Sequence, residues 1–402
     1  MKLKALEIEG YRSLRDFHLK PGRITVCVGA NGSGKSNIYN SLKLLQAAAR
    51  GDLARRIVAE GGMDSIMWAG EESSEETGKL RIKIRSKNIE YMLRLGFVPK
   101  SDVMDDGDMG PGLSFFSRDP DIKFEKIDFL NNGKSTSLLK RKRTSVVARN
   151  MEGRSAPYAI PMAGSESVLY ALKEPQKFPE IYKLRSDLDS WRFYYDFRTD
   201  LDSPIRRPHR ATLTPIMSDD GHDLASAIAT IFAVGDEERF KNLVDEAFPG
   251  SAIELNEEDG LLELSVVTPG LWRTMSSREL SDGTLQFLLL MAALLTPRPA
   301  PFIVLNEPET SIHEDLIESL AMLIKEAAKR SQVLVTTHSH KLARLLKKEP
   351  GCRFFELNKE EGETKIKGQS LDELPDYEDD EDQKEEVDDL MENFEDDEED
   401  DD

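Results

Sequence analysis

The residues with the clearest chemical meaning form one short stretch, Gly29-Ala30-Asn31-Gly32-Ser33-Gly34-Lys35-Ser36. Two glycines with four residues between them, followed by Lys and Ser, are the pattern of a phosphate-binding loop, in which backbone N–H groups surround the phosphates of a nucleotide. Lys35 is expected to reach the β- and γ-phosphates, and Ser36 to offer its hydroxyl to Mg²⁺. We expect nucleotide contacts from Gly29, Asn31, Gly32, Ser33, Gly34, Lys35, Ser36 and Asn37.

The flanking sequence favours this interpretation over a flexible Gly/Ser turn. Residues 24–28 are typical of a short buried strand, and Ile38, Leu42 and Leu45 recur at helical spacing in a helix expected to run to about Arg50. A strand that leads through the loop into a helix aims the positive end of that helix at a bound phosphate.

Two further strands are expected to bring polar residues to the same place. The apolar run 302–305 ends at Asn306-Glu307-Pro308-Glu309, and the run 333–335 ends at Thr336-Thr337-His338. Open α/β sheets bind their ligands at the carboxyl ends of the strands. An acidic turn or a lone His is commonly structural, but the order of both patterns behind the loop favours a nucleotide site.

A third stretch, Leu280-Ser281-Asp282-Gly283-Thr284, precedes a strongly apolar helix. Ser281 and the N–H groups after it are expected at the anion-attracting end of that helix. Taken alone, this is an ordinary helix cap.

The remaining pattern is β-rich around a less regular middle. Period-two alternation predicts a hairpin over 80–97, and a second hairpin is expected around 257–260. From about 100 to 210 the periodicity weakens, so this stretch is a candidate insertion. It carries basic clusters at 140–143 and 206–210, which could neutralise phosphates or simply form a solvated loop face.

The composition is that of a globular protein with an acidic tail. Of 402 residues, 39% are hydrophobic and 32% charged; with no membrane-spanning run or signal-peptide pattern, a cytoplasmic protein is expected. Cys27 and Cys352 form no CxxC pair and are expected to be core residues. Residues 372–402 hold 21 acidic side chains and Lys384, a net of −20, whereas residues 1–371 carry 54 acidic against 53 basic, a net of −1. The tail is expected to be disordered.

Together the motifs resemble the ABC-type ATPase heads of RecF-like and SMC-like DNA-repair proteins and of nuclease-lacking relatives of the OLD family of AAA ATPases. The resemblance covers roughly 1–100 and 211–357. It is carried by the phosphate loop, the signature-like 280–284, the Walker B-like 303–307 and the switch-like His338, with 310–313 similar to a D-loop and 9–14 to the opening of RecF-like heads.

This resemblance implies a fold and a set of roles. The fold class is α/β, a P-loop NTPase with a mixed central sheet, an antiparallel β subdomain and an inserted lid-like region. Glu307 would polarise the attacking water and His338 would contact the γ-phosphate, so the catalytic residues would be Glu307, His338 and Lys35. Ser281 and Gly283 would complete the nucleotide site of a partner subunit in an ATP-bound homodimer.

The chain departs from the family pattern at two places, the metal site and the glutamine that senses the γ-phosphate. Ser36 and Asn306 would serve Mg²⁺, although such heads usually have an acid where this chain has Asn306. The glutamine that senses metal and γ-phosphate is unassigned, because Gln46 falls within the helix after the loop. The expected domains are an N-terminal lobe (1–100), an insertion or lid (101–210), a C-terminal lobe (211–371) and the acidic tail (372–402).

Three functions are compatible with these residues. The first is an ATP-hydrolysing, Mg²⁺-dependent protein whose ATP-driven dimerisation acts on or senses DNA in repair or anti-phage defence, with a nuclease or repair protein as a possible partner. The second is a slow-turnover nucleotide switch that acts through a partner protein. The third, disfavoured by the signature sequence, is the energising subunit of an ABC transporter. The tail could compete with DNA for the basic clusters, or serve only as a solubilising segment.

Overall fold

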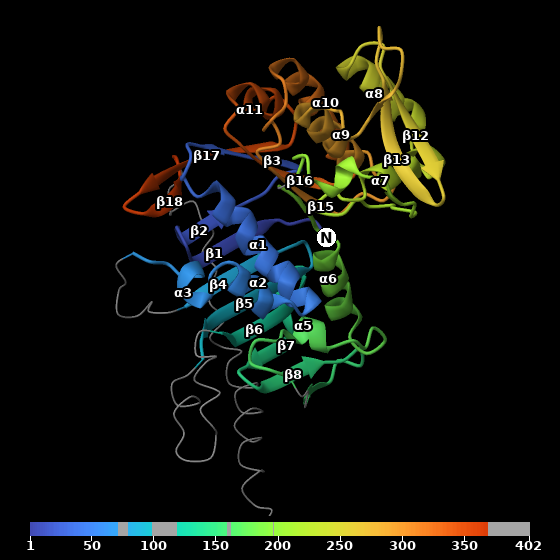
Figure 1. The fold of residues 1–402 in the computed structure, drawn as a ribbon. Helices are drawn as coiled ribbons and strands as arrows, with labels where there is room; N and C mark the ends of the chain where they lie inside the picture. Colours follow the sequence, from blue (N-terminus) through green and yellow to red (C-terminus); the bar gives the residue numbers. More distant parts are fainter. Residues whose placement is uncertain (71–78, 99–118, 159–161, 196, 369–402) are drawn as a thin grey trace, which may run out of the picture. The chain divides into compact units, whose positions relative to one another are not determined.

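The computed structural model describes residues 1–70, 79–98, 119–158, 162–195 and 197–368 (Figure 1). The acidic tail lies outside these residues. Contacts within the chain divide it into two units. Unit 1 comprises Met1–Lys2, Lys20–Tyr39 and Ser190–Leu357, and unit 2 comprises Leu3–Leu19, Asn40–Asp189 and Asn358–Asp402. The four-part division expected from the sequence stays a prediction.

Unit 2 contains an eight-stranded antiparallel sheet in the order β2-β1-β4-β5-β6-β7-β8-β9. The predicted hairpin over 80–97 is confirmed as β4 and β5. The strands are β1 (Ala5–Tyr11), β2 (Leu14–Leu19), β4 (Leu80–Arg85), β5 (Ile89–Phe97), β6 (Pro120–Asn131), β7 (Lys134–Lys142), β8 (Ser145–Arg149) and β9 (Ser155–Pro157). Its helices are α2 (Leu53–Ala59), α3 (Met63–Ile66), α5 (Val168–Ala171) and α6 (Pro179–Asp189).

Unit 1 is organised around five parallel strands in the order β10-β15-β16-β3-β17. Their bounds are β10 (Arg192–Tyr194), β15 (Phe302–Asn306), β16 (Gln332–Thr337), β3 (Ile24–Gly29) and β17 (Cys352–Glu360), and β18 (Glu363–Ile366) follows β17 in the strand order. Because neighbouring strands are parallel, the carboxyl ends of β3, β15 and β16 meet at one edge of the sheet. Both cysteines lie in strands; Cys27 is buried, as expected of a core residue, whereas Cys352 is only partly buried.

A smaller sheet of unit 1 contains β11 (His209–Arg210), β12 (Ala252–Glu258), β13 (Leu261–Val267) and β14 (Met275–Ser276). The predicted hairpin at 257–260 is confirmed as β12 and β13. Asp259 and Gly260 at its turn have φ values of 53° and 77°. Two consecutive positive φ angles are what a two-residue hairpin turn requires, and Asp-Gly supplies them at little cost.

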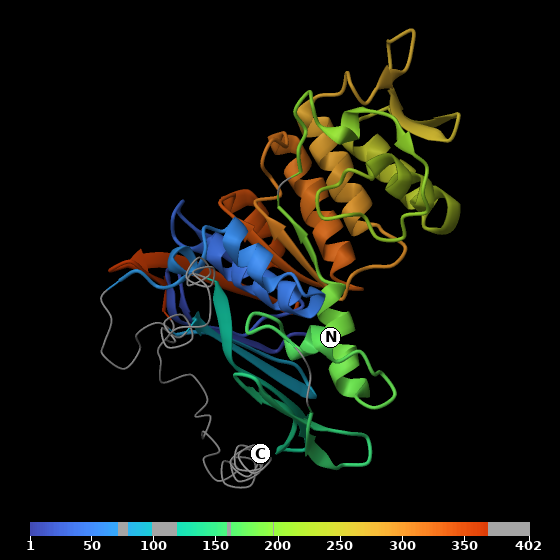
Figure 2. The same ribbon diagram turned by 60° about the horizontal axis from the view of Figure 1, so that its bottom comes forward.

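The helices of unit 1 contribute most of an apolar core, and Figures 1 and 2 show α7, α9 and α10 grouped together. Helix α9 is buried along most of its length because its sequence is apolar on every face, and it packs beside α7 and α10. The helical segments are α7 (Leu224–Val234), α8 (Glu237–Ala247), α9 (Asp282–Leu294), α10 (Ile317–Ala327) and α11 (His340–Lys347), with the short η2 (Pro204–Arg206) and η3 (Glu314–Leu316). Helix α1 (Lys35–Arg50) begins in unit 1 and ends where the sequence predicted.

Candidate nucleotide-binding site

The loop between β3 and α1 has the geometry expected of a phosphate-binding loop. Gly32 and Gly34 adopt φ values of 81° and 94°, a region that favours glycine. Lys35, only 5% exposed, donates its Nζ protons to the carbonyl oxygens of Gly29 (2.7 Å) and Ala30 (3.1 Å). The ammonium is therefore held against the loop, where bound phosphates are expected.

Three of the predicted catalytic side chains come together in unit 1. Glu307 follows β15 and His338 follows β16, at the edge where β3 delivers Lys35. The carboxylate of Glu307 lies 3.6 Å from Lys35 Nζ through Oε1 and 3.8 Å from His338 Nδ1 through Oε2. Glu307 also has a left-handed φ of 46°, which is uncommon for a residue with a side chain, and its N–H donates to the Thr336 carbonyl at 2.8 Å.

Glu309 is a buried carboxylate to which the sequence assigned no role. Its Oε1 accepts hydrogen bonds from the Thr337 hydroxyl and from the N–H groups of His338 (3.0 Å) and Ser339 (3.1 Å), and it lies 3.3 Å from His338 Nδ1. Its Oε2 is buried and has no hydrogen-bond partner among the described residues. Glu309 thus fixes the turn that carries His338. The second acid of the Asn-Glu-Pro-Glu sequence was the available signal.

The signature-like residues occupy a different part of unit 1. Ser281 caps α9, accepting the Thr284 N–H at 3.1 Å. A Cβ at Gly283 would stand 2.5 Å from the Ser311 carbonyl oxygen, so only glycine fits against the D-loop-like segment. In the described part of the chain, no hydrogen bond or ion pair joins Ser281 or Gly283 to residues 29–36.

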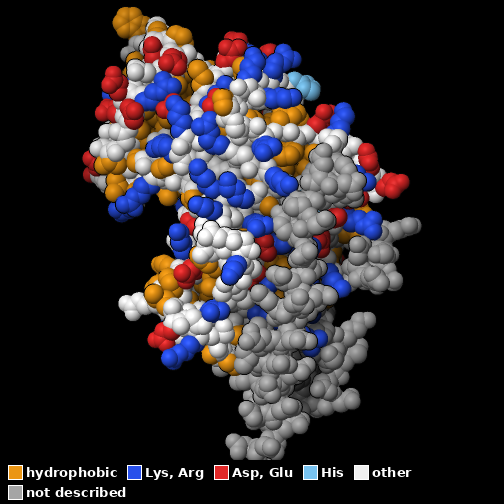
Figure 3. Space-filling model, turned by 180° about the vertical axis from the view of Figure 1, so that it is seen from behind, with side chains coloured by type: hydrophobic (Ala, Val, Ile, Leu, Met, Phe, Trp, Pro, Cys, Tyr) orange, Lys and Arg blue, Asp and Glu red, His pale blue; other side chains and the backbone are white. Residues whose placement is uncertain are grey.

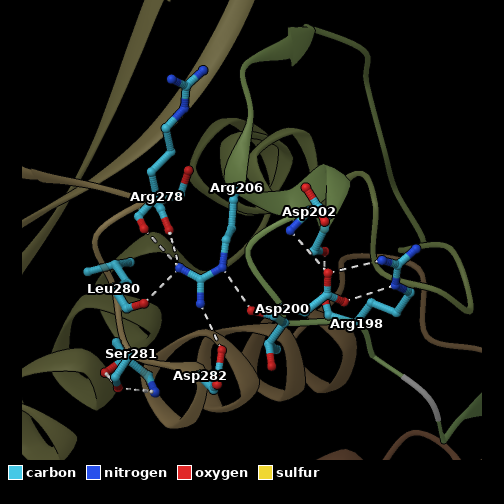
Figure 4. Close-up of polar contacts among 12 residues, drawn as sticks. Arg198, Asp200, Asp202, Arg206, Arg278, Leu280, Ser281 and Asp282 are labelled. Atoms are coloured by element: carbon cyan, nitrogen blue, oxygen red, sulfur yellow. Dashed lines mark hydrogen bonds and ion pairs between the residues drawn. The ribbon is translucent and has the colours of Figure 1, made fainter.

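Arg206, which the sequence presented as a member of a basic cluster, makes a set of internal contacts that the sequence did not predict (Figure 4). Its side chain is 5% exposed and lies against the segment before α9. The guanidinium donates to the carbonyl oxygens of Thr199 (2.8 Å), Ser277 (3.1 Å), Arg278 (3.1 Å) and Leu280 (2.8 Å) and to the Asp282 carboxylate (2.8 Å). One buried cation thus connects segment 199–206 to the start of the signature-like sequence.

Arg206 also corrects the expectation of two free basic clusters. The sequence placed it in the cluster 206–210, and Arg141 in the cluster 140–143. Arg141 in unit 2 is likewise fully buried: it donates to the carbonyl oxygens of Arg143 (2.6 Å) and Gly164 (3.1 Å) and lies 3.9 Å from the Glu125 carboxylate. Neither arginine is available to a ligand, because internal acceptors take up the donors of its guanidinium.

The donor atoms at the metal positions suit Mg²⁺. Ser36 is exposed at the start of α1, and the side-chain oxygen of Asn306 accepts the Thr336 hydroxyl at 2.6 Å, which leaves that oxygen a second lone pair. Hydroxyl and amide oxygens are hard ligands, and nucleotide-bound Mg²⁺ takes only one or two protein ligands beside phosphate and water. The residues present therefore fit the ion. No cluster of three His, Cys, Asp or Glu side chains occurs in the described ranges.

Two ionisable groups near the site have shifted pKa values. Burial raises the pKa of the Cys27 thiol in β3 to about 12, which makes it an inert core residue. A hydrogen bond from Arg273 lowers the pKa of Glu279, two residues before Ser281, to about 2. Gln46 in unit 2 donates to the carbonyl oxygens of Leu188 and Asp189, both at 3.3 Å, and so supports α6.

The parallel strands, the phosphate-binding loop and the signature-like helix start define an ABC-type P-loop ATPase head. Residues 24–344 match the family model described as "AAA domain, putative AbiEii toxin, Type IV TA system", and the chain belongs to this family. Both the expected fold class and the expected family relationship are confirmed, although the nuclease-lacking part stays a prediction.

Curated relatives match only a quarter of the chain. The chromosome partition protein Smc of Mycolicibacterium paratuberculosis is 30% identical over 100 residues, which are 24% of this chain and 8% of that protein. Structural maintenance of chromosomes protein 2 of Schizosaccharomyces pombe is 34% identical over 106 residues, 24% of this chain and 9% of that protein. The SMC head domain of Thermotoga maritima has 18% identity and a TM-score of 0.45, with coverage of 92% of this chain and 100% of that one.

The chain therefore corresponds to a small part of the length of these curated relatives. Among the residues that the structure describes, no helix is both long and apolar enough to span a membrane. A cytoplasmic location stays a prediction.

Proposed function

We propose that this protein is a Mg²⁺-dependent ATPase whose ATP-driven homodimerisation acts on or senses DNA. The observation that carries the proposal is the approach of Lys35, Glu307 and His338 at the ends of three parallel strands, beside a phosphate-binding loop. Each of these side chains has a role in breaking a phosphoanhydride bond, for which positioning and charge compensation suffice.

In this mechanism, Lys35 offsets the negative charge of the β- and γ-phosphates. Glu307, 31% exposed at its side chain, orients the attacking water and accepts its proton. His338, 53% exposed, contacts the γ-phosphate from the turn that Glu309 holds. Ser36 and Asn306 would hold Mg²⁺, which when bound offsets charge that develops as the terminal bond breaks.

The resemblance of residues 280–284 to the signature segment of ABC-type heads supports a composite site. Residues that have no bond to the loop of their own copy can complete the site on a second copy, and a head-to-tail pair would then hold two nucleotides. Contacts that the γ-phosphate makes across the interface would shift the population toward the closed pair, and hydrolysis would release it.

Support for DNA comes from the likeness to proteins named for chromosome partition and maintenance, and from the cations that stay exposed. Lys142 and Arg143 in unit 2, and Arg207 and Arg210 in unit 1, are exposed members of the two basic clusters. Figure 3 shows Lys and Arg side chains distributed over one face of the molecule. Such groups can neutralise phosphates in a salt-dependent way.

The test is a measurement of ATPase rate and oligomeric state with linear DNA, gapped DNA and no DNA. We expect Mg²⁺-dependent turnover, an ATP-dependent dimer, and a change in rate with at least one DNA. The Lys35→Ala variant is the control for contaminating ATPase. A protein that stays monomeric with ATP would contradict the composite site, and a rate indifferent to every DNA would contradict the role of DNA.

A second candidate is a slow-turnover switch that acts through a partner protein. Asn306 favours it, because an amide at this position provides no negative charge for the metal. Tight ATP binding with negligible turnover, whether or not DNA is present, would support this candidate over the first.

A further inference from the structure

The buried guanidinium of Arg206 makes an unusual set of bonds. Four of its five acceptors are backbone carbonyl oxygens, and three of these belong to Ser277, Arg278 and Leu280, within four residues of one another. These acceptors lie 71 to 74 positions further along the chain than Arg206 itself. A guanidinium presents five N–H donors in one rigid plane. The backbone whose carbonyl groups converge on it must therefore follow a particular path.

The carbonyl groups that Arg206 collects immediately precede α9. Asp282, the first residue of this helix, contributes the one carboxylate among these five acceptors, 2.8 Å from Nη2. That contact places an acid at a helix N-terminus and offsets the buried positive charge. Arg206 therefore ties the backbone of residues 277–280 to Asp282, and Ser281, the cap of α9, lies between these contacts (Figure 4). Gly283 is the next residue of the helix.

We propose that Arg206 is a positioning residue, which holds Ser281 and Gly283 in the arrangement needed to complete the nucleotide site of a second copy. The inference rests on the proposed function, since it concerns the half of the composite site that the signature-like segment provides. Arg206 touches neither nucleotide nor water in this role. It acts through the backbone of residues 277–282.

Position, rather than overall stability, is the property that this network specifies. The Arg206–Asp282 ion pair is buried on the arginine side alone, since the Asp282 side chain is 59% exposed. It adds little net stability, because desolvation of the guanidinium offsets the attraction. Removing only the guanidinium, however, leaves three neighbouring carbonyl groups without their donor, and they must turn toward other donors or water. The segment before α9 is then free to adopt several paths, whereas Lys35, Glu307 and His338 keep their own contacts.

The experiment compares variants in a Glu307→Gln background, in which hydrolysis is slow and an ATP-bound dimer is expected to accumulate. Arg206→Gln removes the charge and most of the donors. Arg206→Lys keeps the charge but not the planar donor set. Arg154→Gln is the control for loss of an arginine, because this side chain is 81% exposed and belongs to neither basic cluster. Among the described residues its ion pair is with Glu152, at 3.6 Å.

Three quantities are measured: binding of a fluorescent ATP analogue to the monomer, the dimer dissociation constant with Mg²⁺ and ATP by analytical ultracentrifugation, and amide exchange over residues 277–285. For Arg206→Gln we expect unchanged analogue binding, faster exchange, and a dimer dissociation constant raised by about tenfold or more, the scale of one lost charged hydrogen bond. Arg206→Lys should be intermediate, and Arg154→Gln should match its parent.

The outcomes separate this inference from the proposed function. If the Glu307→Gln parent does not dimerise with ATP, the composite site and the role of Arg206 in it both fail. If the parent dimerises and Arg206→Gln dimerises as tightly, only the positioning role is overturned. A third outcome is that Arg206→Gln and Arg206→Lys neither bind the analogue nor show a cooperative thermal unfolding transition. Arg206 then supports the whole fold, and the positioning role is again overturned.

Discussion

The turn after β16 and the segment before α9 are each held by one buried charged side chain, and the two side chains have opposite charge. Glu309 accepts the N–H groups of His338 and Ser339. Arg206 donates to the carbonyl oxygens of three residues that precede Ser281. In both places a single side chain satisfies consecutive backbone groups, which fixes a short irregular segment without regular secondary structure.

The two devices differ in what they are attached to. Glu309 lies in the turn after β15 and accepts hydrogen bonds from the end of β16 and the turn that follows it. The His338 turn is therefore tied to the strand that also positions Glu307. Arg206 instead ties the signature-like segment to residues 199–206. The composite site thus has two half-sites. The first contains the His338 turn and binds the nucleotide of its own copy, and the second is the signature-like segment, which contacts the partner's nucleotide. The difference implies that a substitution can disturb one half-site without the other.

Lys35→Ala is expected to have the largest effect. Both half-sites act on a bound nucleotide, so neither can function when ATP no longer binds. The ammonium that offsets the β- and γ-phosphates is lost, and we expect tight ATP binding to be abolished. Isothermal titration with ATP and Mg²⁺ measures this, with Arg210→Ala on the exposed β11 as a control. Unchanged affinity in Lys35→Ala would remove the site assignment itself.

Glu307→Gln is expected to have the next largest effect and to sharpen the contrast between binding and chemistry. The amide keeps the shape of the side chain but cannot accept a proton from water, so hydrolysis should slow by about 10² or more while ATP binding persists. Single-turnover hydrolysis and sedimentation would show an ATP-bound dimer. If Glu309→Gln gave this behaviour and Glu307→Gln did not, the roles of the two acids would have to be exchanged.

Glu309→Gln tests the first half-site as Arg206→Gln tests the second. The amide oxygen can still accept from the turn, but its NH₂ group would take the place of Oε2, which is buried without a partner among the described residues. We expect a stability loss of about 1–3 kcal/mol and slower hydrolysis, with the dimer retained when ATP is bound. Chemical denaturation and sedimentation measure the two quantities. Loss of the dimer without loss of turnover would reverse the comparison.

The sequence predicted the parts of this molecule that depend on local pattern. The phosphate-binding loop, the hairpin at β4 and β5, and the Asp-Gly turn at 259–260 each have a short-range cause in residue type and spacing. Strands β6 and β7 were not predicted because pairing partners, rather than their weak alternation, stabilise them. They lie within the stretch that the sequence presented as a candidate insertion.

Arg141, Arg206 and Glu309 show why charged residues are harder to interpret. A run of basic residues suggests that all of its side chains reach solvent. Each basic cluster here nevertheless contains one buried arginine, which donates to backbone carbonyl groups distant in the sequence. Carbonyl acceptors are present at every position, so the sequence contains no signal for which of them converge. Glu309 was visible as a second acid, but only the fold shows that its acceptors serve the His338 turn.

The smallest expected effect is that of Asn306→Asp, which concerns the metal side of the first half-site alone. Asn306 accepts the Thr336 hydroxyl through its side-chain oxygen at 2.6 Å, and its NH₂ group has no partner among the residues described. A carboxylate can keep the Thr336 bond with one oxygen and offer the other to the water shell of Mg²⁺. The half-saturating Mg²⁺ concentration for ATP hydrolysis should then fall by about fivefold, which corresponds to roughly 1 kcal/mol. Asn306→Ala, which removes both functions, should shift the Mg²⁺ titration the other way. An Asn306→Asp titration that overlays the wild type would mean that the amide is already adapted to this position, and that the slow-turnover alternative cannot rest on Asn306.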